Sequence, residues 1–181
     1  IISSAIPTKN PELTAAKAAN LEIIHRSDLL AALAKEKKTI AVAGSHGKTT
    51  TSTFITTLCA IAKQDPTAII GGFIPHYKSN GHAGEGNLLI AEADESDGTL
   101  IKMKPEIGLI TNLELDHTDH FETLDALIET MKAFGDQCRD LLVNQDCQIL
   151  QKNFKASATW STKNAEEATF AGIPISIQGN Q

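Results

Sequence analysis

The sequence lacks several features that mark common classes of protein. It has three cysteines, Cys59, Cys138 and Cys147, and no CxxC pair, which favours reduced thiols in a cytoplasm over a disulfide framework. No apolar stretch approaches the roughly 20 residues that span a bilayer, and no charged leader precedes an apolar segment. We therefore expect a cytoplasmic protein with no membrane partner.

Positive charge is also scarce. The chain carries 16 Lys and Arg against 22 Asp and Glu, a formal net charge of -6. Nucleic acids and anionic membranes usually select surfaces rich in Lys and Arg. The composition therefore argues against a nucleic-acid partner, and any anionic ligand must be held by a local site.

Short apolar runs are abundant, and they alternate with helical patterns. Strands that are apolar on both faces and alternate with helices indicate a parallel sheet that is covered on both sides. The sequence therefore predicts an α/β fold with a mostly parallel sheet flanked by helices. The runs are TIAVAG (39–44), TAIIGG (67–72), LLIAEAD (88–94), IGLITNLE (107–114) and DLLVNQD (140–146).

Two amphipathic helices are expected to lie on this sheet. The segment after the GKT sequence places Phe54, Leu58 and Ile61 on one side, which is the spacing of a helix with an apolar face. Residues 122–134 repeat the pattern. Residues 75–87 are rich in turn formers, so we expect them to form an exposed loop.

The stretch AVAGSHGKTTTSTF, residues 41–54, predicts a phosphate site. A strand, a glycine-bearing turn and a helix that starts at Lys48 would aim backbone N–H groups and a helix dipole at one point. Lys48 would add a charge for the β- and γ-phosphates, and the Thr49 hydroxyl would bind Mg²⁺. The generic pattern G-x-x-x-x-G-K-[ST] has glycine where Val42 stands, and Gly44 follows two residues later.

The run LLIAEADESD ends in carboxylates. In phosphate-loop enzymes, an acidic side chain at the end of a strand lies beside the nucleotide-bound Mg²⁺. Glu92 is the first acid reached, so we assign it to the metal. Asp94 is expected to point to the same face as Glu92, because side chains alternate along a strand. Glu95 and Asp97 fall in the following loop. The alternative to a metal site is that these acids form a solvated acidic loop.

A second polar cluster, in TNLELDHTDH, ends another apolar strand. It contains Asp116, His117, Asp119 and His120. A neutral imidazole can ligate a metal, and the carboxyl ends of strands are where open α/β sheets build their sites. A capping or surface histidine is the alternative for His117. A zinc pair with His120 is weakly supported, because no third His or Cys stands at ligand spacing.

The stretches GSHGKTTT, EADESDGT and TNLELDH, with SSAI and NPE upstream, resemble the Mur ligases of bacterial peptidoglycan synthesis. The resemblance covers nearly the whole chain and weakens after about residue 150. It implies a P-loop-containing central domain that binds ATP and Mg²⁺ and drives amide-bond formation through an acyl phosphate. EADESDG followed by TNLELDHTDH favours the member that joins L-alanine to UDP-N-acetylmuramate.

The resemblance also assigns roles to matching positions. It implies that Lys48, Glu92 and His117 are catalytic, and that Thr49, Glu92 and His117 hold the metal. The residues that it implies for nucleotide binding are Gly44, Ser45, His46, Gly47, Lys48, Thr49 and Thr50.

The resemblance implies an incomplete enzyme. Residues 1–38, with expected helices over 11–20 and 27–37 and a short LEII strand between them, would be the tail of an N-terminal UDP-sugar domain and a linker. Residues 39–181 would be an incomplete central ATP-binding domain. No G-x-G-x-x-G turn for the UDP-sugar occurs, and the chain runs from Ile1 to QGNQ. We therefore expect a fragment that retains part of a Mg-ATP site and cannot ligate L-alanine by itself.

Two other functions stay open. Within the family, a ligase that recycles murein tripeptide shares the loop and the EADE motif. From another class, the chain could be a phosphate-loop switch module, but guanine-binding switches carry N-K-x-D after a strand and none occurs here. Oligomer formation is also left open, because GIPISIQ could make an edge strand that pairs between chains.

Overall fold

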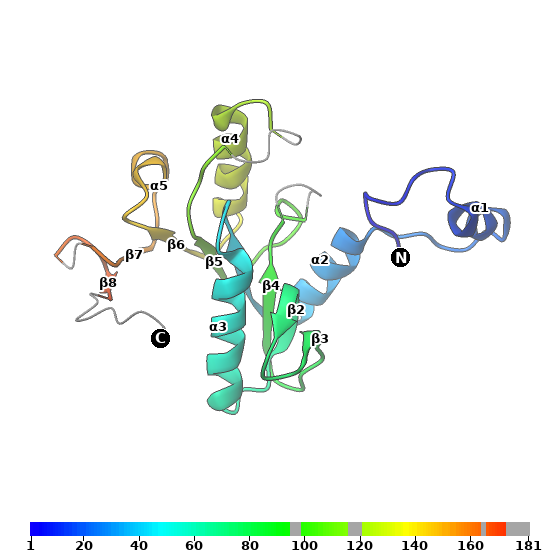
Figure 1. Ribbon diagram of the computed structural model, residues 1–181, viewed down its shortest axis with the longest axis horizontal. Helices are drawn as coiled ribbons and strands as arrows, with labels where there is room; N and C mark the ends of the chain where they lie inside the picture. Colours follow the sequence, from blue (N-terminus) through cyan, green and yellow to red (C-terminus); the bar gives the residue numbers. More distant parts are fainter. Residues whose placement is uncertain (95–98, 116–120, 164–165, 173–181) are drawn as a thin grey trace, which may run out of the picture.

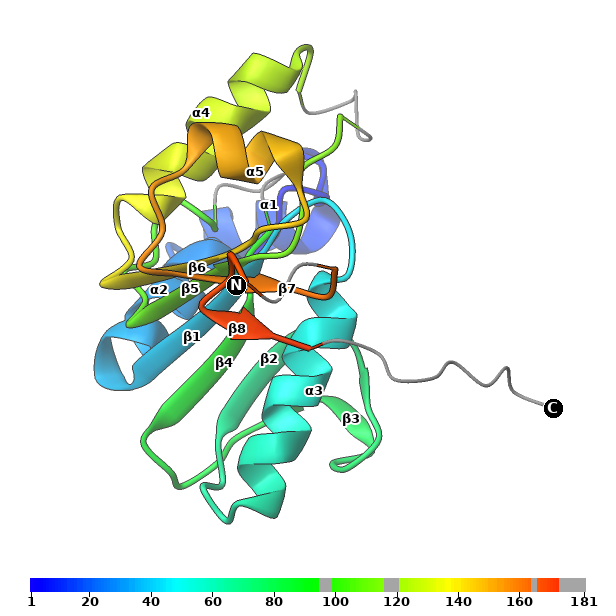
Figure 2. The same ribbon diagram turned by 90° about the vertical axis from the view of Figure 1, so that its left-hand side faces the viewer.

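The computed structural model describes residues 1–94, 99–115, 121–163 and 166–172. Its centre is an eight-stranded sheet in the order β3-β2-β4-β1-β5-β6-β7-β8, with helices on both faces (Figures 1 and 2). Only β3 runs antiparallel to its neighbour among the described strands. The predicted α/β fold with a mostly parallel sheet is confirmed. The strands are β1 (Lys38–Ala43), β2 (Thr67–Ile74), β3 (Ser79–His82), β4 (Leu88–Glu92), β5 (Ile107–Ile110), β6 (Asp140–Asn144), β7 (Ala158–Ser161) and β8 (Phe170–Ala171).

One face of the sheet is covered by α2 (Arg26–Glu36), α4 (Leu124–Gly135) and α5 (Gln148–Asn153). The inner side of α4 is its apolar stripe: Leu127, Ile128, Met131 and Phe134 are all buried. The predicted packing of this helix is therefore confirmed. Its start is set by Thr123, whose side chain accepts a hydrogen bond from the Ala126 N–H, which satisfies one of the unpaired donors of the first turn.

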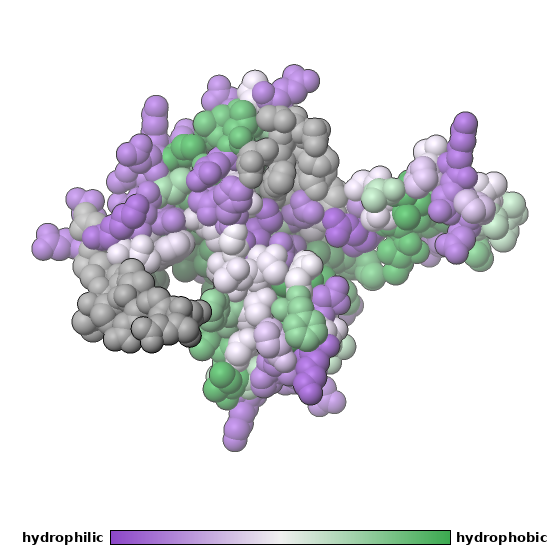
Figure 3. Space-filling view, in the orientation of Figure 1, coloured by the Kyte–Doolittle hydropathy of each residue, from purple (hydrophilic) through white to green (hydrophobic). Residues whose placement is uncertain are grey.

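The opposite face carries α3 (Lys48–Ile61), and here the predicted orientation is wrong. Phe54, Leu58 and Ile61 are exposed by 66%, 65% and 68%, whereas Ser52 and Thr56 are fully buried. Apolar side chains (green) accordingly show on the outward surface of the molecule over α3 (Figure 3). Helical periodicity identified the apolar stripe but not the side that faces the sheet.

Close approach explains this orientation of α3. A Cβ atom on Gly72 of β2 would lie 2.4 Å from Cγ2 of Thr49, so the first turn of the helix almost touches the strand. Only small side chains fit at such a distance. Ser52 is small enough to fit. Its buried hydroxyl is satisfied because it donates to the Lys48 carbonyl oxygen at 2.7 Å within the helix.

The N-terminal segment contains α1 (Pro11–Ala18), which lies away from the sheet in Figure 1. The helices expected over 11–20 and 27–37 are confirmed as α1 and α2. The strand predicted at LEII is wrong, because the described residues around it form only an isolated bridge between Ile2 and His25. A lone bridge cannot supply the ladder of hydrogen bonds that makes a strand.

The prediction that residues 75–87 form an exposed loop is only partly right. β3 lies within this segment and pairs antiparallel with β2. A ring stack fixes this hairpin: the Tyr77 and His82 centroids lie 3.7 Å apart at 9°. His82 Nε2 also lies 2.8 Å from Asp65 Oδ1, and this hydrogen bond lowers the pKa of Asp65 below its usual value, helped by the Glu85 N–H. The strand is polar throughout, so hydrophobic periodicity could not reveal it.

The three cysteines are free, as predicted, and Cys138 packs against the main core. Burial raises its pKa to about 12. The unfolded thiol loses its proton near pH 8.5, as model thiols do. The native chain thus holds more protons between that pH and its own pKa, so this group makes the folded chain progressively less stable as pH rises through that window.

We expect alkylation of Cys138 by iodoacetamide at pH 8.5 to be about a thousandfold slower in the folded chain than in urea, because only the thiolate reacts. Peptide mass spectrometry after timed quenching measures the rate at each cysteine. Equal rates for Cys138 in the folded and unfolded chain would contradict its burial.

Trp160 is the chain's single tryptophan and lies in β7. Its indole N–H is buried, and it has no hydrogen-bond partner among the described residues. No helix in the described ranges has the length and apolar character needed to cross a membrane.

Candidate phosphate-binding site

The stretch that carries the GKT sequence forms a strand-to-helix junction, as predicted. β1 is a central strand of the sheet, a loop of residues 44–47 follows it, and α3 begins at Lys48. Gly47 is the N-cap residue of α3, with φ +79°. The first N–H groups of the helix and its positive dipole end therefore point out of the carboxyl edge of the sheet, where an anion can bind.

The departure from the generic phosphate-loop pattern at Val42 has a simple structural reason. Val42 is the fifth residue of β1 and is fully buried, so a side chain there packs in the core. The glycine that the turn needs is Gly44, whose φ is +123°. A Cβ on Gly44 would lie 2.2 Å from Thr111 Oγ1 and 2.9 Å from the Asn112 carbonyl oxygen, so only glycine fits.

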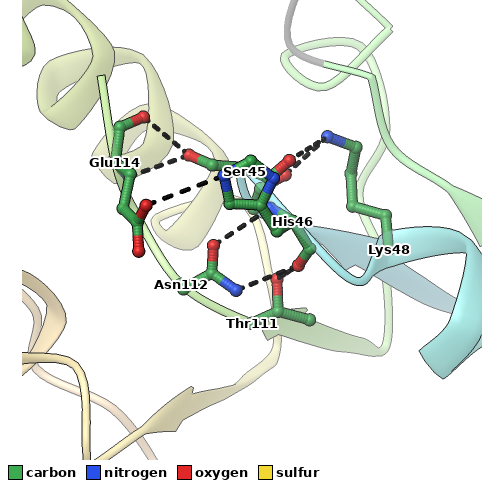
Figure 4. Close-up of polar contacts among 7 residues, drawn as sticks. Ser45, His46, Lys48, Thr111, Asn112 and Glu114 are labelled. Carbon is green, nitrogen blue, oxygen red and sulfur yellow. Dashed lines mark hydrogen bonds and ion pairs between the residues drawn. The ribbon is translucent and has the colours of Figure 1, made fainter. Parts of the chain in front are cut away.

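The residues after β5 brace the β1–α3 loop (Figure 4). Ser45 N–H donates to the Asn112 carbonyl oxygen at 3.0 Å, and Ser45 Oγ donates to the Glu114 carbonyl oxygen and accepts from its N–H, both at 2.9 Å. His46 N–H donates to Asn112 Oδ1 at 3.0 Å, and Thr111 Oγ1 donates to the His46 carbonyl oxygen at 2.6 Å. The loop is therefore fixed before any ligand arrives.

Lys48 spans this loop from the first turn of α3. Its Nζ donates to the carbonyl oxygen of Gly44 at 2.5 Å and lies 3.4 Å from that of Ser45. The ammonium is thus held against the carbonyl oxygens of the β1–α3 loop. His46 places its Nε2 3.7 Å from Glu114 Oε2, and Thr50 is an exposed residue of the same first turn.

Thr49 and Glu92 are brought together, as predicted from the sequence. β4 lies beside β1 with Glu92 opposite Val42, and Thr49 Oγ1 lies 3.0 Å from both carboxylate oxygens of Glu92. Glu92 Oε2 also accepts from the Gly71 N–H at 2.9 Å. A hydroxyl and a carboxylate are hard oxygen donors of the kind that Mg²⁺ prefers, so these side chains fit the predicted metal.

Asp94 forms an ion pair with Arg26 at the start of α2, with Nη2 and Oδ2 3.4 Å apart. His117 lies outside the described residues, and so do the other candidates Glu95, Asp97, Asp116, Asp119 and His120. The proposed metal role of His117 therefore remains a prediction.

Sequence reasoning missed the residues that support the site. Thr111, Asn112 and Glu114 hold the loop, and Gly71 positions Glu92. Their only signal was a polar TN pair after an apolar run, and a role follows from it only when β5 is known to lie beside β1.

Comparisons with known families match almost the whole chain. A family described as the Mur ligase middle domain matches residues 42–176. A second, described as the Mur ligase family catalytic domain, matches residues 1–38.

Curated relatives are similar over the full chain. UDP-N-acetylmuramate--L-alanine ligase of Prochlorococcus marinus (strain MIT 9303) is 62% identical over 100% of the chain, which covers 37% of the relative. The protein with the same name from Parasynechococcus marenigrum (strain WH8102) is 59% identical over 100% of the chain and 39% of the relative. The chain thus spans well under half the length of these relatives.

Solved structures share the fold. UDP-N-acetylmuramate-alanine ligase from Thermotoga maritima superposes with a TM-score of 0.79 at 23% identity, over 90% of the chain and 38% of that protein. The MurF ligase of the same organism, solved in complex with ADP, gives a TM-score of 0.60 at 22% identity, over 76% of the chain and 37% of that protein.

Proposed function

Because the chain belongs to the Mur ligase family, we propose that it is the ATP-binding part of an enzyme that joins L-alanine to UDP-N-acetylmuramate in the cytoplasm. The observation that carries this proposal is that α3 starts with Lys48 and Thr49 just after β1, with Lys48 Nζ on the loop carbonyl oxygens and the Thr49 hydroxyl 3.0 Å from the Glu92 carboxylate. The names of relatives at 59% and 62% identity support the acceptor and the amino acid. For that reason we prefer this function to the murein tripeptide ligase.

The proposed assignment of the chain to two domains follows the two family matches. Residues 1–38 would belong to the tail of a UDP-sugar domain and a linker, and residues 39–181 to an incomplete ATP-binding domain. Matches over residues 1–38 and 42–176 support this boundary. Because relatives are more than twice as long, we expect no ligation of L-alanine by this chain alone.

In the proposed reaction a carboxylate oxygen of UDP-N-acetylmuramate attacks the γ-phosphorus of ATP, and ADP leaves. The amine of L-alanine then attacks the acyl carbon, phosphate leaves, and the amine gives up its extra proton. The first step brings two anions together, so cations and fixed N–H groups supply most of the catalysis. Lys48 and the β1–α3 loop would hold the β- and γ-phosphates. Thr49 and Glu92 would hold Mg²⁺, which supplies positive charge at the γ-phosphate.

The experiment that tests this function is a calorimetric titration of the chain with ATP and with GTP, each with Mg²⁺ and with EDTA. We expect ATP to bind with a clear gain from Mg²⁺. In Glu92→Gln, which keeps the side chain's shape but removes its charge, that gain should fall by about tenfold because a charge-assisted contact to the metal is lost.

The matched control is Glu129→Gln on α4, whose side chain is 71% exposed and lies 3.0 Å from Lys132 Nζ on the same helix. It should bind Mg-ATP as the parent chain does. A preference for GTP would favour the switch module instead, and phosphate release at a normal ligase rate from this chain with both substrates would refute the incomplete-enzyme proposal.

A further inference from the structure

The second half of β2 carries two consecutive glycines, Gly71 and Gly72, which lie against the two side chains that the proposed function assigns to Mg²⁺. A Cβ on Gly72 would lie 2.4 Å from Thr49 Cγ2, and a Cβ on Gly71 would lie 3.1 Å from Glu92 Oε2. Because successive positions of a strand face opposite sides, the two glycines meet different neighbours. Each of the two side chains therefore rests against one glycine.

Backbone conformation does not require glycine at either position. Among the described glycines, positive φ values belong to Gly44 and Gly47, so a residue with a side chain could adopt the backbone of residues 71 and 72. Glycine inside a strand lowers stability, and it often marks a site where another group approaches closely. The reason for the pair is therefore the space that it leaves for Thr49 and Glu92.

Gly71 supplies a hydrogen bond as well as space. Its N–H donates to Glu92 Oε2 at 2.9 Å, and β2 runs parallel to β4, the strand that ends in Glu92. The carboxylate is therefore held on the β2 side, where both of its oxygens lie 3.0 Å from the Thr49 hydroxyl. Neighbouring oxygens of an octahedron with Mg–O distances of about 2.1 Å are about 3.0 Å apart, so the two groups are already at the spacing that one Mg²⁺ requires.

Gly72 decides how the Thr49 side chain is turned. The Thr49 methyl group points at Gly72, while its hydroxyl lies beside Glu92. Threonine occupies staggered rotamers. Of the two other rotamers, one sets the hydroxyl where the methyl group now lies, and the other turns the methyl group toward Glu92. A side chain at position 72 would therefore either push α3 away from β2 or turn the hydroxyl off the carboxylate, and both changes separate the pair.

We propose that Gly71 and Gly72 are positioning residues for Mg²⁺, because they allow the Thr49 hydroxyl and the Glu92 carboxylate to meet at the spacing from which both can bind one ion. This inference rests on the proposed function and adds the residues that set its metal affinity. Neither glycine offers a side chain to ATP or to the metal, so its effect is confined to the metal-dependent part of binding. Changes in groups that orient metal ligands typically alter metal affinity by about 10–100-fold.

The test measures, by calorimetry on each variant, the gain in ATP affinity that Mg²⁺ gives over EDTA. In Gly72→Ala this gain should fall by about tenfold, whereas the affinity in EDTA should stay at the parental value. Gly71→Ala is a milder second variant, since its Cβ would meet only the carboxylate end of Glu92. It should lower the gain in the same direction without lowering the melting temperature.

Thr49→Ser gives the decisive comparison, because serine keeps the hydroxyl and lacks the methyl group that points at Gly72. In the Thr49→Ser background, Gly72→Ala should change the gain from Mg²⁺ by less than about twofold, since the two positions are coupled through that methyl group. An effect of Gly72→Ala on packing alone would instead lower ATP affinity equally with and without Mg²⁺.

Gly81→Ala on β3 is the matched control. A Cβ there would lie 3.6 Å from the Ala68 carbonyl oxygen, an ordinary contact, so the gain from Mg²⁺ should not change. Full retention of the gain by Gly72→Ala, or an equal loss in the parent and Thr49→Ser backgrounds, would overturn the positioning role. If Gly72→Ala fails to fold, an unchanged gain in Gly71→Ala overturns it.

The parent chain separates this inference from the function on which it rests. If the parent gains affinity from Mg²⁺ while the glycine variants keep that gain, the positioning role is wrong and the proposed nucleotide function stands. A parent chain that binds ATP no more tightly with Mg²⁺ than with EDTA would overturn both.

Discussion

Lys48→Ala is expected to lower the affinity of the chain for Mg-ATP by about a hundredfold. Lys48 is the first residue of α3, and its Nζ lies on the carbonyl oxygens of Gly44 and Ser45 in the β1–α3 loop. In the proposed complex it would contact the β- and γ-phosphates. Each charge-assisted hydrogen bond contributes about 1.5–3 kcal/mol, so the loss of two costs about 3 kcal/mol or more, which is a factor of about a hundred.

Calorimetric titration with Mg-ATP measures this loss, and thermal unfolding separates it from a loss of folded protein. Lys38→Ala is the control, because Lys38 is an exposed lysine at the start of β1, at the opposite edge of the sheet. If Lys48→Ala bound Mg-ATP as tightly as Lys38→Ala, the proposed phosphate site would be wrong.

Gly44→Val is expected to destabilise the chain by about 3–5 kcal/mol and to abolish nucleotide binding. The backbone at Gly44 has φ +123°, and holding a residue with a side chain in a sparsely populated region costs about 1–3 kcal/mol. The added Cβ would also meet Thr111 Oγ1 at 2.2 Å and the Asn112 carbonyl oxygen at 2.9 Å. Overpacking of this kind typically adds about 1–3 kcal/mol.

The loop and the segment after β5 would have to separate to relieve the contact. That movement would break the hydrogen bonds that hold Ser45 and His46 in place. For a chain of this size the melting temperature should fall by about 10 °C. Gly172→Val is the control, since a Cβ there meets nothing within 4 Å. A Gly44→Val chain with parental melting temperature and ATP affinity would show that the loop tolerates a different backbone.

The fold class could be predicted because it depends on local patterns. Apolar runs that alternate with amphipathic segments indicate a covered parallel sheet, and these runs coincide with the starts of β1, β2, β4, β5 and β6. Two errors came from non-local effects. Ser52 and Thr56 face the sheet because β2 comes so close to α3, and β3 forms because β2 offers an edge to pair with.

The residues of the candidate site also differ in whether local sequence or non-local contacts reveal them. Lys48, Thr49 and Glu92 could be found because each sits at a recognisable end of an element. Asn112 and Gly71 could not, because their contacts with the β1–α3 loop and with Glu92 depend on which strands are neighbours. Short sequence motifs carry the groups that touch a ligand, whereas the groups that hold those in place are distributed over the sheet.

The position of Trp160 decides how ligand binding to this chain can be followed. β7 is separated from β1 by β5 and β6, so its indole is on the order of 14 Å from the strand that precedes the proposed phosphate loop, at about 4.8 Å per strand. We therefore expect intrinsic fluorescence to report unfolding around β7 and to change little on the proposed binding of ATP. An optical binding assay needs a fluorophore introduced near the carboxyl end of β1.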